Sequence, residues 1–179
     1  SSDLPDIFIG NGLTHALRIL FGWGKESIKH NLSIATIESG KWKTQPSSAF
    51  HSSLPTDTAA IIYTSGSTGL PKGAVYSQEN LSAQLDLLQA AFDISSDEID
   101  LPAFPLYALI DLLLGVTSVI PNITFPVPGK TDPKKVINAI QKFNVTNMFA
   151  SPVVLEILSK YSSTHPIKLP SLKRIITAG

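Results

Sequence analysis

Short apolar runs alternate with amphipathic segments of about ten to sixteen residues, and this alternation constrains the fold more than any other feature. The runs are rich in β-branched residues, which is typical of strands, while the segments between them gather apolar side chains on one helical face. The predicted strands are Asp6–Ile9, Leu32–Glu38, Thr58–Tyr63, Ala74–Tyr76, Ile99–Phe104, Ile123–Val127, Val145–Ala150 and Leu172–Ala178. The predicted helices are Leu13–Phe21, one from an N-cap at Ser77 to Phe92, Leu106–Val119, Asp132–Phe143 and Pro152–Tyr161. This order predicts an α/β fold with mostly parallel sheets flanked by helices.

Local sequence adds expectations about burial. The uninterrupted apolar run Thr58–Tyr63 predicts a strand buried on both faces, and Leu106–Val119 predicts a buried helix. Pro102 lacks a backbone N–H, so its strand is expected to be irregular or to lie at a sheet edge.

Composition excludes several classes of protein. Of 179 residues 43% are hydrophobic, which is enough to build a core. The net charge is zero and basic residues are not clustered, so no nucleic-acid partner is expected. There is no cysteine and the four histidines are scattered, so no metal site is predicted. The longest apolar run, Leu106–Ile120, contains Asp111 and falls short of the ~18 residues of a membrane span, so we expect a cytoplasmic protein.

The segment Thr64–Gly73 carries the strongest functional signal. It follows an apolar strand and reads Thr-Ser-Gly-Ser-Thr-Gly-Leu-Pro-Lys-Gly. Glycines let backbone N–H groups approach an anion, hydroxyls add donors without bulk, and Lys72 adds a compact positive charge. The combination predicts a polyphosphate-binding loop. It is not a Walker A loop, because Pro71 stands where that motif needs its second glycine.

Tyr63–Gly73 resembles the phosphate-loop signature of the adenylate-forming superfamily. That resemblance implies an enzyme that uses ATP and Mg²⁺ to activate a carboxylic acid as an acyl-adenylate, with release of pyrophosphate. It also implies that the loop holds the ATP phosphates through Thr64, Ser65, Gly66, Ser67, Thr68, Gly69 and Lys72. Ile175–Gly179 resembles the strand that enters the family's adenine loop, which places Gly179 at its entry.

Other segments resemble the β-lactone synthetases of bacterial long-chain olefin biosynthesis. They are Phe8–Gly10, Leu20–Gly24, Phe104–Leu109 and Thr117–Pro121. The resemblance implies a long-chain fatty acid substrate with a β-hydroxyl group. Ala108 stands where many CoA ligases of the superfamily carry histidine, but a long-chain acyl-CoA ligase that uses CoA remains the alternative.

The acyl-substrate pocket is expected to include four residues, Tyr107, Ala108, Asp111 and Ser151. Three of these residues also suit a purely structural role. Tyr107 suits a core position and Ser151 suits a helix cap, while a buried Asp111 needs a partner and also suits a hydrogen bond between elements.

The resemblance also bears on domain organisation. Residues 1–54 are expected to form a strand-helix-strand segment with a polar linker, and residues 55–179 the phosphate-loop and acyl-site half of an AMP-binding domain. We expect an internal piece of a longer polypeptide, inactive alone, because the family's catalytic lysine lies beyond Gly179. No catalytic residue is therefore assigned within the chain. The alternative of another class is a non-catalytic nucleotide-binding fragment or pseudo-enzyme.

Overall fold

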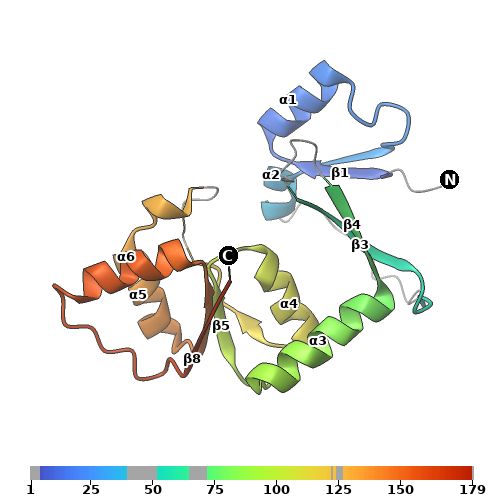
Figure 1. The fold of residues 1–179 in the computed structure, drawn as a ribbon. Coiled ribbons are helices and arrows are strands. Elements are labelled where there is room, and N and C mark those ends of the chain that lie inside the picture. Colours follow the sequence, from blue (N-terminus) through green and yellow to red (C-terminus); the bar gives the residue numbers. More distant parts are fainter. Residues whose placement is uncertain (1–4, 40–51, 65–71, 122, 124–126, 179) are drawn as a thin grey trace. The chain divides into compact units, whose positions relative to one another are not determined.

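The computed structural model describes residues 5–39, 52–64, 72–121, 123 and 127–178 (Figure 1). The chain divides into two compact units, Ser1–Ser52 and Ser53–Gly179. The first contains a two-stranded sheet, and the second contains a two-stranded sheet and a four-stranded sheet. The sequence-based assignment of residues 1–54 and 55–179 to parts of a larger domain stays a prediction.

The first unit is a small parallel βαβ arrangement. Its elements are β1 (Ile7–Gly10), α1 (Gly12–Phe21), β2 (His30–Ser33) and α2 (Ile34–Glu38), and β1 pairs with β2 in parallel. The strand predicted over Leu32–Glu38 is therefore wrong in its second half, which is helical. Ile34 and Ile37 are three residues apart, a spacing that fits a helix as well as an irregular strand.

The second unit begins with an antiparallel ribbon of β3 (Thr58–Thr64) and β4 (Lys72–Ser77), followed by α3 (Gln78–Phe92). The predicted N-cap at Ser77 is confirmed. Its Oγ accepts a hydrogen bond from the Asn80 backbone N–H at 3.1 Å, and the Asn80 Oδ1 accepts one from the Ser77 N–H at 3.2 Å. This reciprocal capping box fixes where the helix begins.

A four-stranded parallel sheet forms the rest of the unit, and this confirms the predicted α/β class. The strand order is β6-β5-β7-β8, with all neighbours parallel. Its strands are β5 (Ile99–Pro102), β6 (Thr117–Ser118), β7 (Asn147–Ala150) and β8 (Arg174–Thr177). The intervening helices are α4 (Leu106–Leu114), the 3₁₀ helix η1 (Pro128–Lys130), α5 (Pro133–Phe143) and α6 (Pro152–Ser162).

Of the two alternatives for the strand that contains Pro102, the sheet edge is wrong, because β5 lies between β6 and β7. The Ala103 N–H points to β7, where it donates to the Phe149 carbonyl at 2.7 Å. Successive N–H groups alternate sides in a strand, so the Pro102 nitrogen faces β6. Pairing with β6 ends two residues earlier, at Asp100 with Ser118, so the missing N–H removes no hydrogen bond of the sheet.

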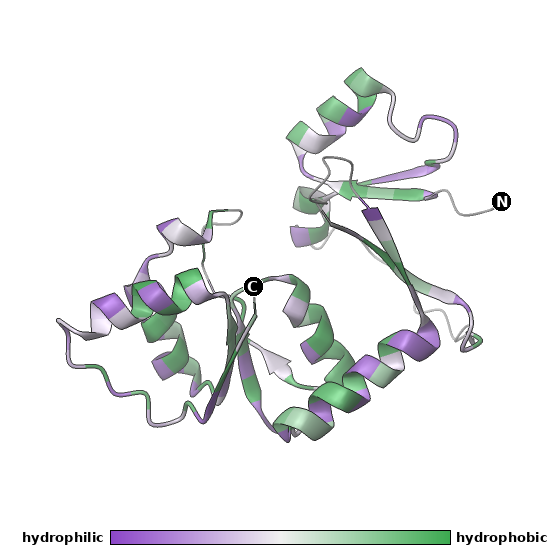
Figure 2. Ribbon diagram, in the orientation of Figure 1, coloured by the Kyte–Doolittle hydropathy of each residue, from purple (hydrophilic) through white to green (hydrophobic). Residues whose placement is uncertain are grey.

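Helices cover both faces of this sheet (Figure 1). On one face, α5 and α6 pack on the core cluster, in which Leu101, Val136, Val145 and Met148 are fully buried. On the other face lie α3 and α4, and Asp100 points toward them. Figure 2 shows that α4 is mostly apolar, whereas hydrophilic and apolar residues alternate along α3. Two-sided burial is what a parallel sheet requires.

The helix predicted over Leu106–Val119 is shorter and less buried than expected. It ends at Leu114 because Gly115 adopts a left-handed conformation with φ of 71°, and Thr117 and Ser118 then form β6. Within α4 only Asp111 is buried, and Leu112 is 72% exposed. The strand predicted over Ile123–Val127 lies largely outside the described residues.

The core makes a direct stability prediction. Replacing the fully buried Leu101 with alanine removes apolar contacts between the sheet and the helices α5 and α6. We therefore expect the free energy of unfolding of the intact protein to fall by about 2–5 kcal/mol. Leu101→Met conserves volume and should cost less than about 1.5 kcal/mol. Urea denaturation measures both. Losses of equal size in the two variants would show that Leu101 does not fill a close-packed site.

Candidate active site

Thr64 and Lys72, which flank the central part of the predicted phosphate loop, lie at one end of the β3–β4 ribbon. Thr64 and Lys72 form the last residue pair of the antiparallel register, so the chain leaves and re-enters the ribbon at adjacent positions. Ser65, Gly66, Ser67, Thr68 and Gly69 lie outside the described residues. The ribbon thus brings together the two described members of the predicted site, Thr64 and Lys72.

The expectation that the strand before this loop is buried is wrong. Tyr63 is 69% exposed and Ile61 is 43% exposed. Apolar composition gives burial only where a second layer covers the strand, and β3 pairs with β4 alone, outside the four-stranded sheet. Gly73 permits close packing across this ribbon. A Cβ at that position would lie 3.1 Å from the Ile61 Cγ2 and 3.2 Å from the Tyr63 ring.

Tyr107 stands between the sheet and an apolar cleft. Its ring stacks on Phe149 of β7, with centroids 3.4 Å apart and planes at 15°. It also lines a cleft of about 370 Å³ between α3 and α4, together with Gln84, Leu87, Leu88, Ala91 and Ile110. A mainly apolar cleft with few polar groups is the usual form of a site for an apolar ligand.

Asp111 is buried, and its carboxylate has a partner on a neighbouring strand. The Ser118 Oγ donates a hydrogen bond to the Asp111 Oδ2 at 2.6 Å, which joins α4 to β6. This contact agrees with the structural alternative derived from the sequence. A role of Asp111 in the acyl site stays a prediction.

Asp100 forms a second carboxyl group beside Asp111, and sequence reasoning missed it. Burial raises the pKa of Asp100 to about 7, and the neighbouring charge and hydrogen bond of Asp111 act in the same direction. Burial also raises the pKa of Asp111, although hydrogen bonds with Ser118 and Asp100 oppose that shift. Two adjacent buried carboxyl groups cannot both ionise cheaply, so they share one proton, with Asp100 as its main holder. The sequence feature that could have identified Asp100 is its position as a charged residue within an otherwise apolar strand.

The carboxyl pair belongs to a polar network that crosses the sheet. A hydrogen bond from Asn147 of β7 lowers the pKa of Asp100 and thus partly opposes the effect of burial. Arg174 of β8 donates to the Asn147 Oδ1 at 3.4 Å and binds both carboxylate oxygens of Glu98, at 3.0 and 3.3 Å. Every strand of the sheet contributes to this network, either directly or, for Glu98, from the residue just before β5.

The fold does not bring the remaining predicted pocket residues to the cleft between α3 and α4. Ala108 and Ser151 are half-buried, and neither lines the cleft between α3 and α4 or the small cavity that Asp100 and Asp111 line. Ser151 occupies the N-cap position of α6, but its side chain makes no capping hydrogen bond. Gly179 lies outside the described residues. The pocket roles of Ala108 and Ser151 therefore stay predictions.

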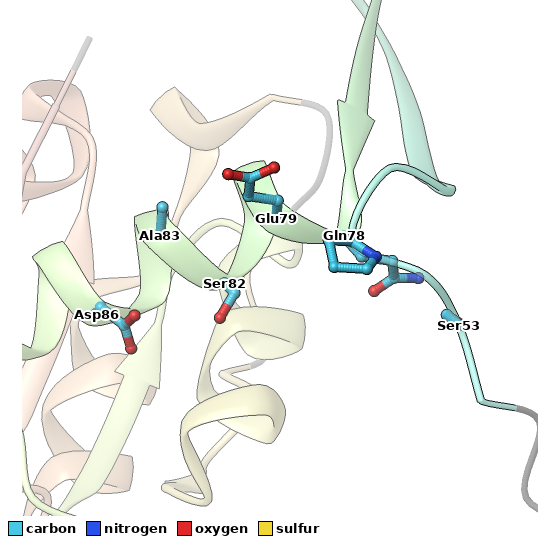
Figure 3. Close-up of a pocket in the computed structure, with 7 residues that line it drawn as sticks. Ser53, Gln78, Glu79, Ser82, Ala83 and Asp86 are labelled. Carbon is cyan, nitrogen blue, oxygen red and sulfur yellow. The ribbon is translucent and has the colours of Figure 1, made fainter.

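A larger hollow, of about 520 Å³, lies along the first turns of α3 (Figure 3). It is lined by Ser53, Pro55, Gln78, Glu79, Ser82, Ala83 and Asp86. The carboxylates of Glu79 and Asp86 would repel phosphate groups, and none of the predicted site residues lies here. We therefore do not place the ATP site in this hollow.

Neither a metal centre nor a membrane span is found in the part of the chain that the structure describes. Within it, no three His, Cys, Asp or Glu side chains are grouped closely enough to hold a metal ion. No helix of that part is long and apolar enough to cross a membrane.

The loop sequence after β3 is typical of adenylate-forming enzymes, and so is a parallel sheet with helices on both faces. Comparison with known families agrees. Residues 24–179 match the AMP-binding enzyme family, so the chain belongs to that family. This result confirms the superfamily resemblance inferred from Tyr63–Gly73.

Two curated relatives also confirm the resemblance to one branch. The chain is 37% identical to the olefin β-lactone synthetase of Stenotrophomonas maltophilia (strain K279a) and 35% identical to that of Xanthomonas campestris pv. campestris. Both matches cover 98% of the chain and 32% of the relative. The chain thus spans about a third of the length of these proteins.

Solved structures support the fold. The N-terminal domain of FACL13 from Mycobacterium tuberculosis superposes with a TM-score of 0.76 at 19% identity, over all of this chain and 46% of that one. ATP-bound MatB from Rhodopseudomonas palustris superposes with a TM-score of 0.73 at 19% identity, over 99% of this chain and 36% of that one. The fold is therefore that of part of an adenylate-forming enzyme's N-terminal domain.

The carboxyl pair predicts how stability depends on pH. Asp100 has a pKa raised to about 7 in the folded protein, against 3.8 for an ordinary aspartate. The stability linked to its proton is fully present below about pH 4 and is lost as pH rises through 7. Between pH 5 and pH 8 the wild type should lose about 1–3 kcal/mol more than Asp100→Asn, which cannot ionise.

Urea denaturation of the intact protein at the two pH values tests this expectation. Asp86→Asn, which removes an exposed carboxylate from α3, should behave as the wild type. If Asp100→Asn shows the same pH dependence as the wild type, Asp100 does not hold a proton near neutral pH.

Proposed function

We propose that the intact protein activates a long-chain β-hydroxy fatty acid with ATP and then closes it to a β-lactone. In the first step a carboxylate oxygen attacks the α-phosphorus of ATP, the bond to the bridging oxygen breaks, and pyrophosphate leaves. In the second step the β-hydroxyl oxygen attacks the acyl carbon, the hydroxyl proton is lost, and AMP leaves. The 37% identity to an olefin β-lactone synthetase across 98% of the chain is the observation that carries this proposal.

Within this chain, the ribbon end supports the first step. Negative charge develops on the departing pyrophosphate, and fixed donors that face it lower the barrier. Lys72 and the hydroxyl-rich segment after Thr64 have the chemistry for this role. Lys72 starts β4, so backbone pairing with Thr64 sets where its side chain begins. Mg²⁺, when bound with ATP, would neutralise further phosphate charge.

The cleft between α3 and α4 supports a fatty acyl substrate. Leu87, Leu88, Ala91 and Ile110 give it an apolar wall, and Tyr107 closes it toward the sheet. Each methylene buried there contributes about 0.8 kcal/mol, so even partial burial separates long acids from short ones by orders of magnitude.

Acyl-CoA synthesis is the second candidate. It is favoured by a match, 31% identical over 73% of the chain, to a 4-chlorobenzoate–CoA ligase of Arthrobacter sp. In that case the CoA thiol rather than the internal hydroxyl would attack the adenylate. In either case we propose that the reaction takes place in the cytoplasm.

Lys72 provides the first test. We expect Lys72→Ala to lower acid-dependent exchange of pyrophosphate into ATP by about 100-fold in the intact protein, because a charge that stabilises the leaving group is lost. Lys135→Ala removes an exposed lysine of α5 and should leave the rate unchanged. Unchanged exchange in a folded Lys72→Ala protein would contradict the loop assignment.

Acid selectivity provides the second test. Exchange should rise steeply with chain length, and a hydroxy acid should yield lactone and AMP without added CoA. Products are identified by mass spectrometry with and without CoA. Thioester formed only with CoA, and no lactone, would support the second candidate. Best activity on acetate would contradict the apolar cleft, and no exchange with any acid would favour a non-catalytic nucleotide-binding protein.

A further inference from the structure

One buried oxygen of the carboxyl pair has no hydrogen-bond partner in the part of the chain that the structure describes. Among the described residues, the Asp100 Oδ1 is inaccessible to solvent and receives no hydrogen bond. The whole residue is only 2% exposed. A buried acceptor without a donor is costly, so such an oxygen normally faces a bound polar group.

A cavity of about 30 Å³ is lined in part by Asp100, on the face of the sheet that α3 and α4 cover. Its polar lining consists of Asp100, Asp111 and Asn147, and the rest of the wall is Leu88, Ile94, Tyr107, Ile110, Leu114, Phe149 and Ile176. This volume suits one oxygen-sized group. The cavity has three residues in common with the cleft between α3 and α4, namely Leu88, Tyr107 and Ile110.

The chemistry of the pair selects the kind of group that fits. Asn147 and Asp111 already engage Asp100, and the shared proton lies between the two carboxyl groups. The free Oδ1 is therefore a carbonyl-like acceptor that needs a donor. A carboxylate or phosphate offers none, and an alkyl group would leave the oxygen unsatisfied. A hydroxyl on an otherwise apolar molecule meets both the polar and the apolar parts of the wall.

We infer that this cavity is a hydroxyl-binding site, in which the Asp100 Oδ1 accepts a hydrogen bond from the hydroxyl of a long-chain hydroxy acid whose alkyl chain lies in the cleft between α3 and α4. The inference rests on the proposed function and names a determinant of its specificity. Asp111 and Ser118 act as positioning residues, because they hold the other side of the Asp100 carboxyl group.

The test compares two acids that differ only in the hydroxyl, 3-hydroxyhexadecanoic and hexadecanoic acid, in calorimetric titrations of the intact protein without ATP. The wild type should bind the hydroxy acid about tenfold more tightly, as one buried hydrogen bond allows. Asp100→Leu should reduce this ratio to about one while leaving the affinity for hexadecanoic acid unchanged. If Asp100 had a purely structural role, Asp100→Leu would lower the affinity for both acids equally.

Asp100→Asn is the matched variant. Its Oδ1 is retained, and its amide N–H replaces the carboxyl O–H toward Asp111, so the preference for the hydroxy acid should persist. If Asp100→Leu does not fold, Ile94→Phe fills the small cavity without lining the larger cleft and should also abolish the preference.

Equal wild-type affinity for the two acids, or a preference that survives both Asp100→Leu and Ile94→Phe, would overturn the inference and indicate that the cavity holds only water. Pyrophosphate exchange in the same preparations separates the two proposals. Exchange with both acids but no hydroxyl preference refutes only the hydroxyl site, whereas no exchange with any acid refutes the proposed function.

Discussion

Burial of β5 and β7 between two layers of helices is the constraint on which the four-stranded sheet depends. These inner strands pair in parallel and carry side chains toward α5 and α6 on one face and toward α3 and α4 on the other. The first face is closed by an apolar core around Leu101 and Met148. The second contains the buried carboxyl pair and the small cavity that Asp100, Asp111 and Asn147 line. Stability and candidate chemistry thus occupy opposite faces of the same strands.

The polar network gives the second face an order that apolar packing alone would not. Hydrogen bonds and one ion pair link six side chains in a row, namely Ser118, Asp111, Asp100, Asn147, Arg174 and Glu98. Each bond needs its partner strand in register, because a slip of one residue would turn these side chains to the other face. The network therefore specifies strand order and register, at the cost of burying polar groups.

Sequence reasoning predicted most of the second unit because its signals are local. The apolar periodicity of α5 and the cap at Ser77 placed helices correctly, and the loop signature identified the family. The errors arose where tertiary context decides. Thr58–Tyr63 is apolar but lacks a covering layer, and Gly115 ends α4 before its apolar pattern ends. Asp100 was missed because its significance depends on Asp111 and Asn147, which reach it only through the fold.

The hairpin that ends at Thr64 and Lys72 has a mechanical consequence. In the described part of the chain, β4 starts at Lys72 and α3 begins only after Ser77, so the chain re-enters as a strand and not as a helix. The two ends of the loop instead stand at the tip of a ribbon whose strand β3, at about 3.3 Å per residue, extends roughly 20 Å from Thr58. Such a ribbon acts as a lever, because a small rotation at its base produces a displacement of about 1 Å at Lys72, which is large for a positioned functional group. Packing at the foot of the ribbon, about 20 Å away, therefore controls how precisely Lys72 is positioned.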